Sequence, residues 1–92
     1  MLNPTYSSQF RKDYKLCGKR GLDLNEILAV MSDLENEIPL QAKHREHQLH
    51  GDYKGSTECH IESDWLLIYD RDKAKKEIYF VRTGTHSELF ES

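Results

Sequence analysis

The sequence predicts an α+β fold in which a layer of two helices packs on a mainly antiparallel sheet. Between residues 8 and 38, apolar residues recur about every 3.6 positions, which is the period of an amphipathic helix. From residue 57 onward they alternate with polar residues, which is the period of a strand. The predicted order is strand, two helices and three strands in a single domain, residues 1–92. A chain of this length buries only about 60–65% of its extended surface, so an active site is expected to be an open groove or a surface cleft.

Residues 2–6 predict a short strand at the edge of the sheet. A helix is expected to follow, with Ser7 or Ser8 as its N-cap. Three residues at helical spacing form its apolar face: Phe10, Tyr14 and Cys17. Either Gly18 or Gly21 is expected to end this helix, because glycine readily adopts the left-handed conformation found after helices.

The second helix is predicted to begin after Asp23, and Glu26 completes a capping-box pattern with this N-cap. Its apolar face is expected to contain Leu24, Ile27, Leu28, Met31 and Leu34. Pro39 is expected to end it and to push the preceding residue out of the helical conformation. Residues 8–38 therefore predict a helical hairpin, and the polar residues 40–52 predict an irregular segment.

Residues 57–62, 65–69 and 77–83 predict three strands, separated by a tight turn at Ser63 and Asp64 and by a charged loop at 70–76. On the first strand, three residues are expected to face the core: Thr57, Cys59 and Ile61. The other three are expected to face solvent: Glu58, His60 and Glu62. The second strand is continuously apolar, so it is expected to be central and covered on both faces. On the third, one face is expected to hold Ile78, Phe80 and Arg82. Residues 85–90 predict a short tail.

Composition excludes several classes of protein. One tryptophan, five tyrosines and three phenylalanines argue against disorder, and apolar runs of about five residues are too short to span a membrane. We therefore expect a cytoplasmic protein without a membrane partner. Cys17 and Cys59 have no metal-ligand spacing, and two cysteines make no disulfide framework, so reduced thiols are expected.

The net charge of −3 is unevenly distributed. Residues 1–22 contain five basic residues and one acid, whereas residues 23–37 contain five acids and no base. An acidic protein is a poor free-standing nucleic-acid binder, but its basic helix can still dock on a polyanion.

Histidine, arginine and aromatic side chains recur in the C-terminal half, and an antiparallel sheet can bring them to one face. His47, His60 and His86 provide groups that transfer protons near neutral pH, and Arg82 provides a cation suited to phosphate. This set suits cleavage of an RNA phosphodiester by the neighbouring 2′-hydroxyl, a route in which histidines supply the acid and the base and no metal is required.

Simpler interpretations exist for each residue alone. His47 and His60 are typical solvated histidines, His86 can cap a helix, and Arg82 can form an ion pair with Glu58 or Glu62. A metal-binding module is a further alternative, because His44, His47 and His50 are spaced by three. Their segment does not have the pattern of a stable helix, and no carboxylate completes a ligand set, so this alternative is disfavoured.

Three segments in the C-terminal half resemble the YafQ-type toxins of the RelE superfamily. They are the segment His47-Gln48-Leu49-His50-Gly51, the segment from Cys59 to Tyr69 with its His-Ile-x-x-Asp-Trp motif, and the segment from Arg82 to Phe90 with its Arg-x-Gly-Thr-His-x-x-Leu-Phe motif. The motifs keep the order and spacing of that family. The resemblance implies the RelE-like microbial RNase fold and a toxin of a bacterial type II toxin–antitoxin system.

The resemblance also implies an activity and a site. Toxins of this kind are mRNA interferases that cut mRNA in the ribosomal A site without a metal or another cofactor, leaving a 2′,3′-cyclic phosphate or a 3′-phosphate. The implied catalytic set is His47, His60, Asp64, Arg82, His86 and Phe90. The expected RNA contacts are Lys12, Lys15, Lys19, Lys54 and Trp65. Within the catalytic set, His47 and His86 are the expected proton-transfer groups, and Arg82 is expected to hold the phosphate.

The implied partners are the ribosome, mRNA and a DinJ- or RelB-like antitoxin, with operator DNA reached only through the antitoxin. A second interpretation is kept open. In it, the chain is a catalytically weak homologue that binds its antitoxin and acts mainly as a corepressor of their operon.

Overall fold

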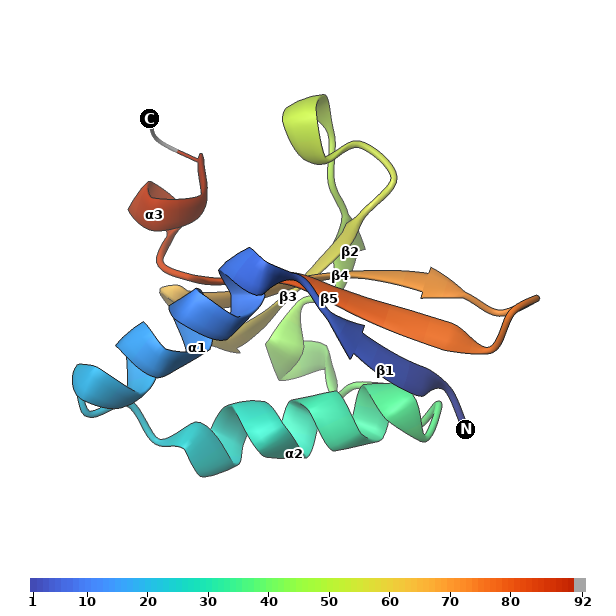
Figure 1. The fold of residues 1–92 in the computed structure, drawn as a ribbon, viewed down its shortest axis with the longest axis horizontal. Coiled ribbons are helices and arrows are strands. Elements are labelled where there is room, and N and C mark those ends of the chain that lie inside the picture. The colour runs from blue at the N-terminus through green and yellow to red at the C-terminus, as the bar shows by residue number, and fades with distance from the viewer. Residues whose placement is uncertain (91–92) are drawn as a thin grey trace.

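The computed structural model describes residues 1–90, which form a five-stranded sheet with helices on both faces (Figure 1). The strands are β1 (Asn3–Tyr6), β2 (His47–Gln48), β3 (Thr57–Glu62), β4 (Trp65–Asp72) and β5 (Glu77–Gly84). The helices are α1 (Ser8–Lys19), α2 (Leu24–Glu35) and α3 (His86–Phe90), and two short 3₁₀ turns are η1 (Ala42–His44) and η2 (Gly51–Tyr53). The predicted α+β class is confirmed. None of the helices in the described part of the chain is long and apolar enough to cross a membrane.

The sheet has the order β1-β5-β4-β3-β2. Only β1 and β5 run parallel, and the other neighbouring strands are antiparallel. As predicted, β4 is central and buried on both faces, with Trp65 to Tyr69 all buried. Its pairing with β5 extends to Asp72, so the predicted loop 70–76 shortens to a turn between the two strands.

The helical layer forms the main core. Phe10 and Cys17 of α1 and Ile27 and Met31 of α2 pack against the face of the sheet that contains Phe80. Ser7 and Asp23 cap the two helices as predicted, accepting hydrogen bonds from the backbone N–H groups three and two residues later. The turn between the helices occurs at Gly21, whose φ of 82° lies in the left-handed region that glycine favours.

Two details of α2 differ from the prediction. The helix ends at Glu35 rather than next to Pro39, because Glu37 adopts a left-handed φ of 60° before the proline is reached. Leu28 is 48% exposed, and Val30 is buried instead. An ideal helical stripe thus gives only the average direction of the buried face.

The opposite face of the sheet carries a smaller apolar cluster. Leu66 and Ile68 of β4 pack there against Leu89 of α3, with Leu49 and Tyr53 at the side. Figure 1 shows α3 and the η2 segment above the sheet and α2 below it. Sequence patterns did not predict α3 or β2, which were expected to be a tail and part of an irregular segment. These two short elements carry His86 and His47.

Candidate active site

Three histidines from three elements lie in a row on the face of the sheet opposite α1 and α2. The ring centroids of His47 and His60 are 6.2 Å apart, and those of His60 and His86 are 5.8 Å apart. His47 lies on β2 directly opposite Glu58 of β3, and His60 follows two residues later on the same face of β3. Sheet pairing therefore brings together two histidines that are 13 positions apart in the chain.

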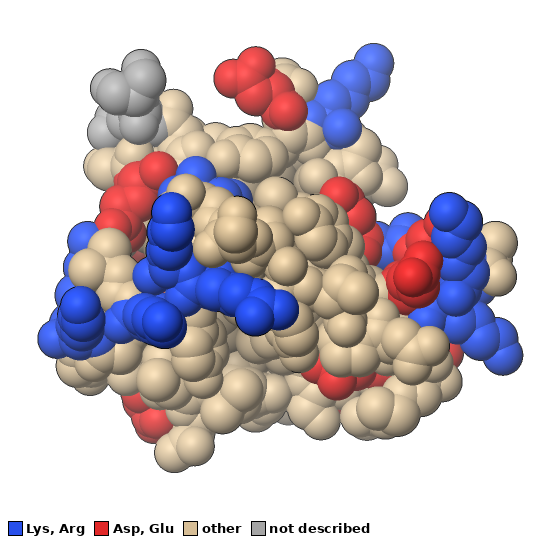
Figure 2. All heavy atoms as spheres, viewed as in Figure 1, with Lys and Arg blue, Asp and Glu red and all other residues tan. Residues whose placement is uncertain are grey.

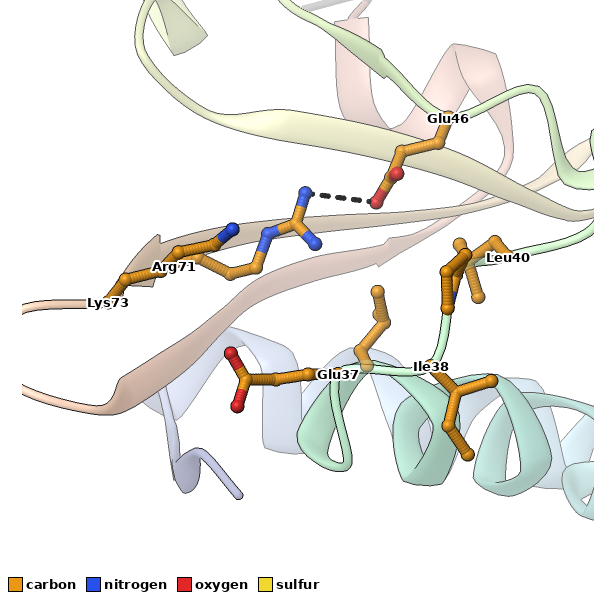
Figure 3. A pocket seen from close by; sticks show the side chains of 8 residues that line it. Glu37, Ile38, Leu40, Glu46, Arg71 and Lys73 are labelled. Atoms are coloured by element: carbon orange, nitrogen blue, oxygen red, sulfur yellow. Dashed lines mark hydrogen bonds and ion pairs between the residues drawn. The ribbon is translucent and has the colours of Figure 1, made fainter.

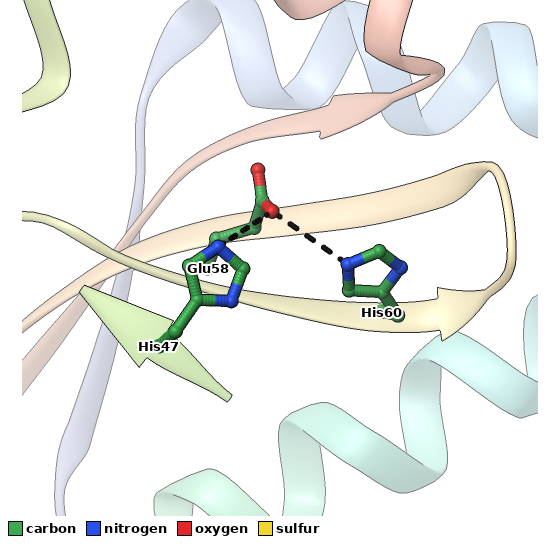
Figure 4. A group of neighbouring side chains, drawn as sticks. All are labelled: His47, Glu58 and His60. Carbon is green, nitrogen blue, oxygen red and sulfur yellow. Dashed lines mark ion pairs between the residues drawn. The ribbon is translucent and has the colours of Figure 1, made fainter. Parts of the chain in front are cut away.

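Glu58 lies between His47 and His60, as Figure 4 shows. Its Oε1 is 3.2 Å from His47 Nε2 and 3.8 Å from His60 Nε2. The prediction that Glu58 faces solvent was wrong, since the residue is 3% exposed. Its second oxygen, Oε2, is buried without a hydrogen-bond partner. Strand alternation identified the face but not the depth of this side chain.

A backbone contact fixes the orientation of the His47 ring. Its Nδ1 lies 2.7 Å from the carbonyl oxygen of Arg45, which can only accept a hydrogen bond. The proton is therefore on Nδ1, and Nε2 is directed at Glu58. Glu46, the residue before His47, is also held in place, because its carboxylate accepts hydrogen bonds from Tyr69 and Arg71 of β4. The pair of Glu46 with Arg71 lines a hollow next to the end of α2 (Figure 3).

His86 forms a dyad with Asp64. Asp64 Oδ1 accepts hydrogen bonds from the backbone N–H of His86 at 3.0 Å and from its ring Nδ1 at 2.6 Å. The backbone hydrogen bond, followed by the ring contact, lowers the pKa of the Asp64 carboxyl below its usual value. Asp64 is thus ionised at neutral pH, and it leaves Nε2 of His86 free to face a substrate.

Arg82 lies at the edge of the same face. An irregularity in the pairing of β4 with β5 places Arg82 opposite Ile68, whereas Tyr69 lies opposite Phe80. Since directly opposite residues share a face, Arg82 does not lie with Ile78 and Phe80 as predicted. Its ion-pair partner also differs from the predicted Glu58 or Glu62.

That partner is Asp13 of α1, whose Oδ2 is 2.7 Å from Arg82 Nε. This hydrogen bond raises the pKa of the guanidinium further. Arg82 Nη1 donates to the hydroxyl of Tyr53 at 3.4 Å, and the Tyr53 ring packs edge-on against Phe90 at 5.7 Å. Phe90 is 44% exposed and lies 6.5 Å from the ring of His86. An arginine, two aromatic rings and the histidine row thus form one continuous surface.

One predicted RNA contact needs correction. Trp65 is 2% exposed and donates its indole N–H to the buried Thr83 hydroxyl at 3.0 Å. It belongs to the core under the helices and has no free face on which a base could stack. The predicted lysines Lys12, Lys15, Lys19 and Lys54 are all exposed. Lys43 and Arg45, which line a hollow next to His60, are further basic residues that the sequence motifs did not indicate.

The metal alternative is also changed by the structure. Among the described residues, the one group with three converging ligand atoms is His47, Glu58 and His60, not His44, His47 and His50. His44 instead places its Nδ1 2.7 Å from the backbone carbonyl oxygen of His60. Both cysteines are buried and unpaired, and burial raises the pKa of the Cys59 thiol to about 12, so this thiol is neutral at physiological pH.

Comparisons with known proteins identify the family of this chain. Residues 2–91 match the family model described as the bacterial toxin of the type II toxin–antitoxin system, YafQ. The chain is 44% identical over 86 residues to the mRNA interferase toxin YafQ of Escherichia coli strain K12, covering 92% of this chain and 91% of that protein.

Solved structures are equally similar. YafQ in the E. coli DinJ-YafQ toxin–antitoxin complex superposes with a TM-score of 0.87 at 42% identity, over 97% of each chain. A metal-bound toxin from Helicobacter pylori superposes with a TM-score of 0.91 at 41% identity, over 98% of this chain and 100% of that chain. The chain therefore belongs to the YafQ family of bacterial toxins of type II toxin–antitoxin systems.

Proposed function

We propose that this chain is an mRNA interferase, an endoribonuclease that cuts translated mRNA on the ribosome by histidine acid–base catalysis. The observation that carries the proposal is the row His47, His60 and His86 on one open face, bordered by Arg82. The similarity to the E. coli mRNA interferase extends over most of the chain and supports the same substrate class.

His86 is suited to the role of general base. The carboxylate of Asp64 holds the proton on Nδ1, so the lone pair on Nε2 is available to take the proton of a ribose 2′-hydroxyl. The ionised carboxylate then stabilises the imidazolium that forms. The 2′-oxygen attacks the adjacent phosphorus, and the P–O5′ bond breaks.

His47 is suited to the role of general acid. With Nδ1 donating to the Arg45 carbonyl, a proton on Nε2 is stabilised by Glu58. Protonated His47 therefore has both of its N–H groups paired, and the Nε2 proton can be passed to the departing 5′-oxygen. His60, on the other side of Glu58, would position the substrate and the carboxylate.

Arg82 would hold the phosphate, because a guanidinium presents several N–H donors and remains charged. It stabilises the charge that develops on the non-bridging oxygens as phosphorus becomes five-coordinate. Phe90 and Tyr53 provide aromatic surface against which a base can stack. Each proposed group thus has a step of the reaction that its chemistry suits.

Ribosome dependence is proposed from charge and shape. The site is an open face, and the whole chain is acidic, so free RNA is expected to bind weakly. The basic face of α1 and Lys54 can contact ribosomal RNA and hold the toxin where mRNA is already presented. The proposed inhibitory partner is a DinJ-like antitoxin, since the similar E. coli toxin is solved in a DinJ-YafQ complex.

The proposal is tested in a translating extract with a defined mRNA, with cuts mapped by primer extension. Purified wild-type protein is expected to give codon-phased cuts, which should be absent on the same RNA without ribosomes. His86→Gln should give at least about 100-fold fewer cuts. Ribosome-independent cutting, or full cutting by a folded His86→Gln protein, would contradict the proposal.

Growth separates this function from the corepressor alternative. Induced wild-type protein is expected to arrest cells, whereas His86→Gln should not, although it should still bind the antitoxin. If wild type leaves growth unchanged but binds the antitoxin and represses the operon, the corepressor alternative replaces the nuclease.

One observation favours a second property of the same face, the binding of a transition-metal ion. The nitrogen and oxygen atoms of His47, Glu58 and His60 lie within 4.8 Å of one another, and Glu58 has an unpartnered buried oxygen. The backbone contact at His47 Nδ1 leaves Nε2 as the ligand atom, which is the usual arrangement at histidine metal sites. Two imidazoles and a carboxylate suit zinc or copper. This donor set is consistent with the metal-bound state of the similar H. pylori toxin.

A bound ion would withdraw the Nε2 lone pairs of His47 and His60 from proton transfer. Wild-type protein is expected to bind one equivalent of Zn²⁺ by calorimetry, and His47→Gln to bind at least about 10-fold more weakly. The control His50→Ala changes an exposed histidine outside the group and should bind like wild type. Equal affinity in wild type and His47→Gln would refute this site.

A further inference from the structure

Asp13 is the one acidic residue of α1, and it is buried against β5 with 8% of its surface exposed. We propose that Asp13 is a positioning residue that orients the guanidinium of Arg82 for the scissile phosphate. This inference rests on the proposed nuclease function. It assigns a role to a helix that carries none of the catalytic residues proposed above.

The Asp13 carboxylate pairs with one edge of the Arg82 guanidinium through two hydrogen bonds. Asp13 Oδ2 accepts from Arg82 Nε at 2.7 Å, and Oδ1 accepts from Arg82 Nη2 at 3.3 Å. Paired contacts of this kind fix the plane of the guanidinium as well as its position. Oδ2 also accepts the backbone N–H of Thr83 at 3.2 Å, which anchors the carboxylate to the strand that carries Arg82.

These two hydrogen bonds determine which N–H donors of Arg82 remain for a ligand. A guanidinium has five N–H donors, and Asp13 occupies the edge formed by Nε and Nη2. One Nη1 hydrogen contacts the hydroxyl of Tyr53. The remaining hydrogens on Nη1 and Nη2 are available to donate to phosphate oxygens. The Arg82 side chain is 22% exposed, so a phosphate can reach these hydrogens.

Charge predicts which kinetic constant should change. Replacing Asp13 by Asn keeps the size of the side chain but removes a negative charge next to the phosphate site. RNA should then bind at least as tightly, whereas a guanidinium free to rotate should stabilise the transition state less well. Loss of a residue that only stabilises the fold would not lower the maximal rate while leaving RNA binding intact.

The test is a double-mutant cycle in single-turnover cleavage of ribosome-bound mRNA. Asp13→Asn is expected to lower the maximal rate about 10-fold or more, with half-saturation within about 2-fold of wild type. In an Arg82→Lys background, the same change should cost less than about 2-fold. Asp33→Asn is the matched control, because it makes the same change of charge at a partly exposed position of α2, and it should cleave like wild type.

An undiminished maximal rate in folded Asp13→Asn, or an equal loss in the Arg82→Lys background, would overturn the inference. If Arg82→Lys cleaves too slowly to measure, the exchange of the Arg82 Nε–H with water replaces the cycle, and it should be faster in Asp13→Asn than in wild type. If Asp13→Asn does not fold, nuclear magnetic resonance of the wild type decides. In the wild-type protein, the Arg82 Nε–H should exchange slowly with water, and fast exchange would refute the pairing of Arg82 with Asp13. If the wild-type protein does not cleave, the proposed nuclease function is refuted instead. The exchange measurement then still tests the pairing of Arg82 with Asp13.

Discussion

His47 and His86 have the same side chain, but their hydrogen-bond partners differ in a way that suits opposite steps. The ring of His86 has a carboxylate on Nδ1 and a free Nε2, whereas His47 has a carbonyl on Nδ1 and a carboxylate at Nε2. The first arrangement favours accepting a proton, and the second favours carrying one. The proposed assignment of base and acid therefore rests on the neighbouring residues rather than on the histidines themselves.

This division predicts the response to a modified substrate. A sulfur atom in place of the scissile 5′-oxygen is a good leaving group that needs no proton. With such an mRNA in the translating extract, His47→Gln is expected to recover to within about 10-fold of wild type, because the acid is no longer required. His86→Gln should remain at least about 100-fold impaired, because the 2′-hydroxyl still needs a base. The opposite pattern would exchange the two roles.

Residue-level prediction from sequence succeeded for the motif histidines and failed for their buried partners. His47, His60 and His86 converge as the antiparallel sheet suggested. Glu58 was misplaced because alternation gives the face of a strand but not what covers it. Asp13 was missed as a partner of Arg82 because the two residues are 69 positions apart, and only the packing of α1 on β5 brings them together.

At the scale of elements, α3 is too short to be stable alone, so tertiary contacts must hold it. Besides the contact of His86 with Asp64, Glu88 accepts hydrogen bonds from Arg20 at 2.7 Å and from the Thr85 backbone at 2.9 Å. Leu89 is buried against the sheet. Helix α1 and its C-cap residue Arg20 therefore contact both segments near the C-terminus, Arg82 through Asp13 and α3 through Arg20.

The ion pair between Arg20 and Glu88 predicts a pH dependence. Its hydrogen bond lowers the pKa of Glu88 from 4.5 to about 2, so the folded state favours the ionised carboxyl. The stabilisation is complete above pH 4.5 and is lost as the pH falls toward 2. The difference in melting temperature between wild type and Glu88→Gln should therefore be largest near neutral pH and vanish near pH 2. A difference that does not vary with pH would contradict this account.

The N-cap of α1 gives a second test at this scale. Ser7 Oγ accepts the Phe10 N–H at 2.8 Å and donates to the Val81 carbonyl at 2.7 Å, so it joins the helix to β5. Ser7→Ala is expected to lower the free energy of unfolding by about 1–2 kcal/mol, measured by urea denaturation. The neighbouring Ser8→Ala is the control and should change it by less than about 0.5 kcal/mol. Equal effects would show that the cap is unimportant.

Secondary structure was predicted correctly where the hydrophobic pattern extends over many residues. Twelve-residue helices and the apolar strand β4 bury enough side chains to reveal their period. The two-residue β2 and five-residue α3 have no measurable period, and they form because the sheet and α1 offer partners. The elements that carry His47 and His86 are thus the ones that local sequence could not predict.

At the scale of the whole molecule, basic and acidic residues are separated. Figure 2 shows a cluster of basic side chains over α1, although the net charge is −3. This distribution favours docking on a polyanion in one orientation over indiscriminate RNA binding. It is consistent with the proposed dependence on the ribosome, which does not require a basic protein.

The orientation predicts a difference between two lysine pairs. Lys12→Glu with Lys15→Glu is expected to weaken ribosome binding about 10-fold or more in sedimentation assays, with a shallower salt dependence. Lys73→Glu with Lys75→Glu makes the same charge change in the turn between β4 and β5 and serves as the control. Equal weakening by both pairs would indicate that only net charge matters.

The most direct test of the central claim is the chemistry of the RNA ends produced in the translating extract. Attack by the 2′-hydroxyl through the histidine row predicts a 2′,3′-cyclic phosphate or 3′-phosphate on one fragment and a 5′-hydroxyl on the other. A single 2′-deoxy substitution at the scissile nucleotide should then abolish the cut. Fragments with a 3′-hydroxyl and a 5′-phosphate, or cutting that survives the 2′-deoxy substitution, would contradict the account.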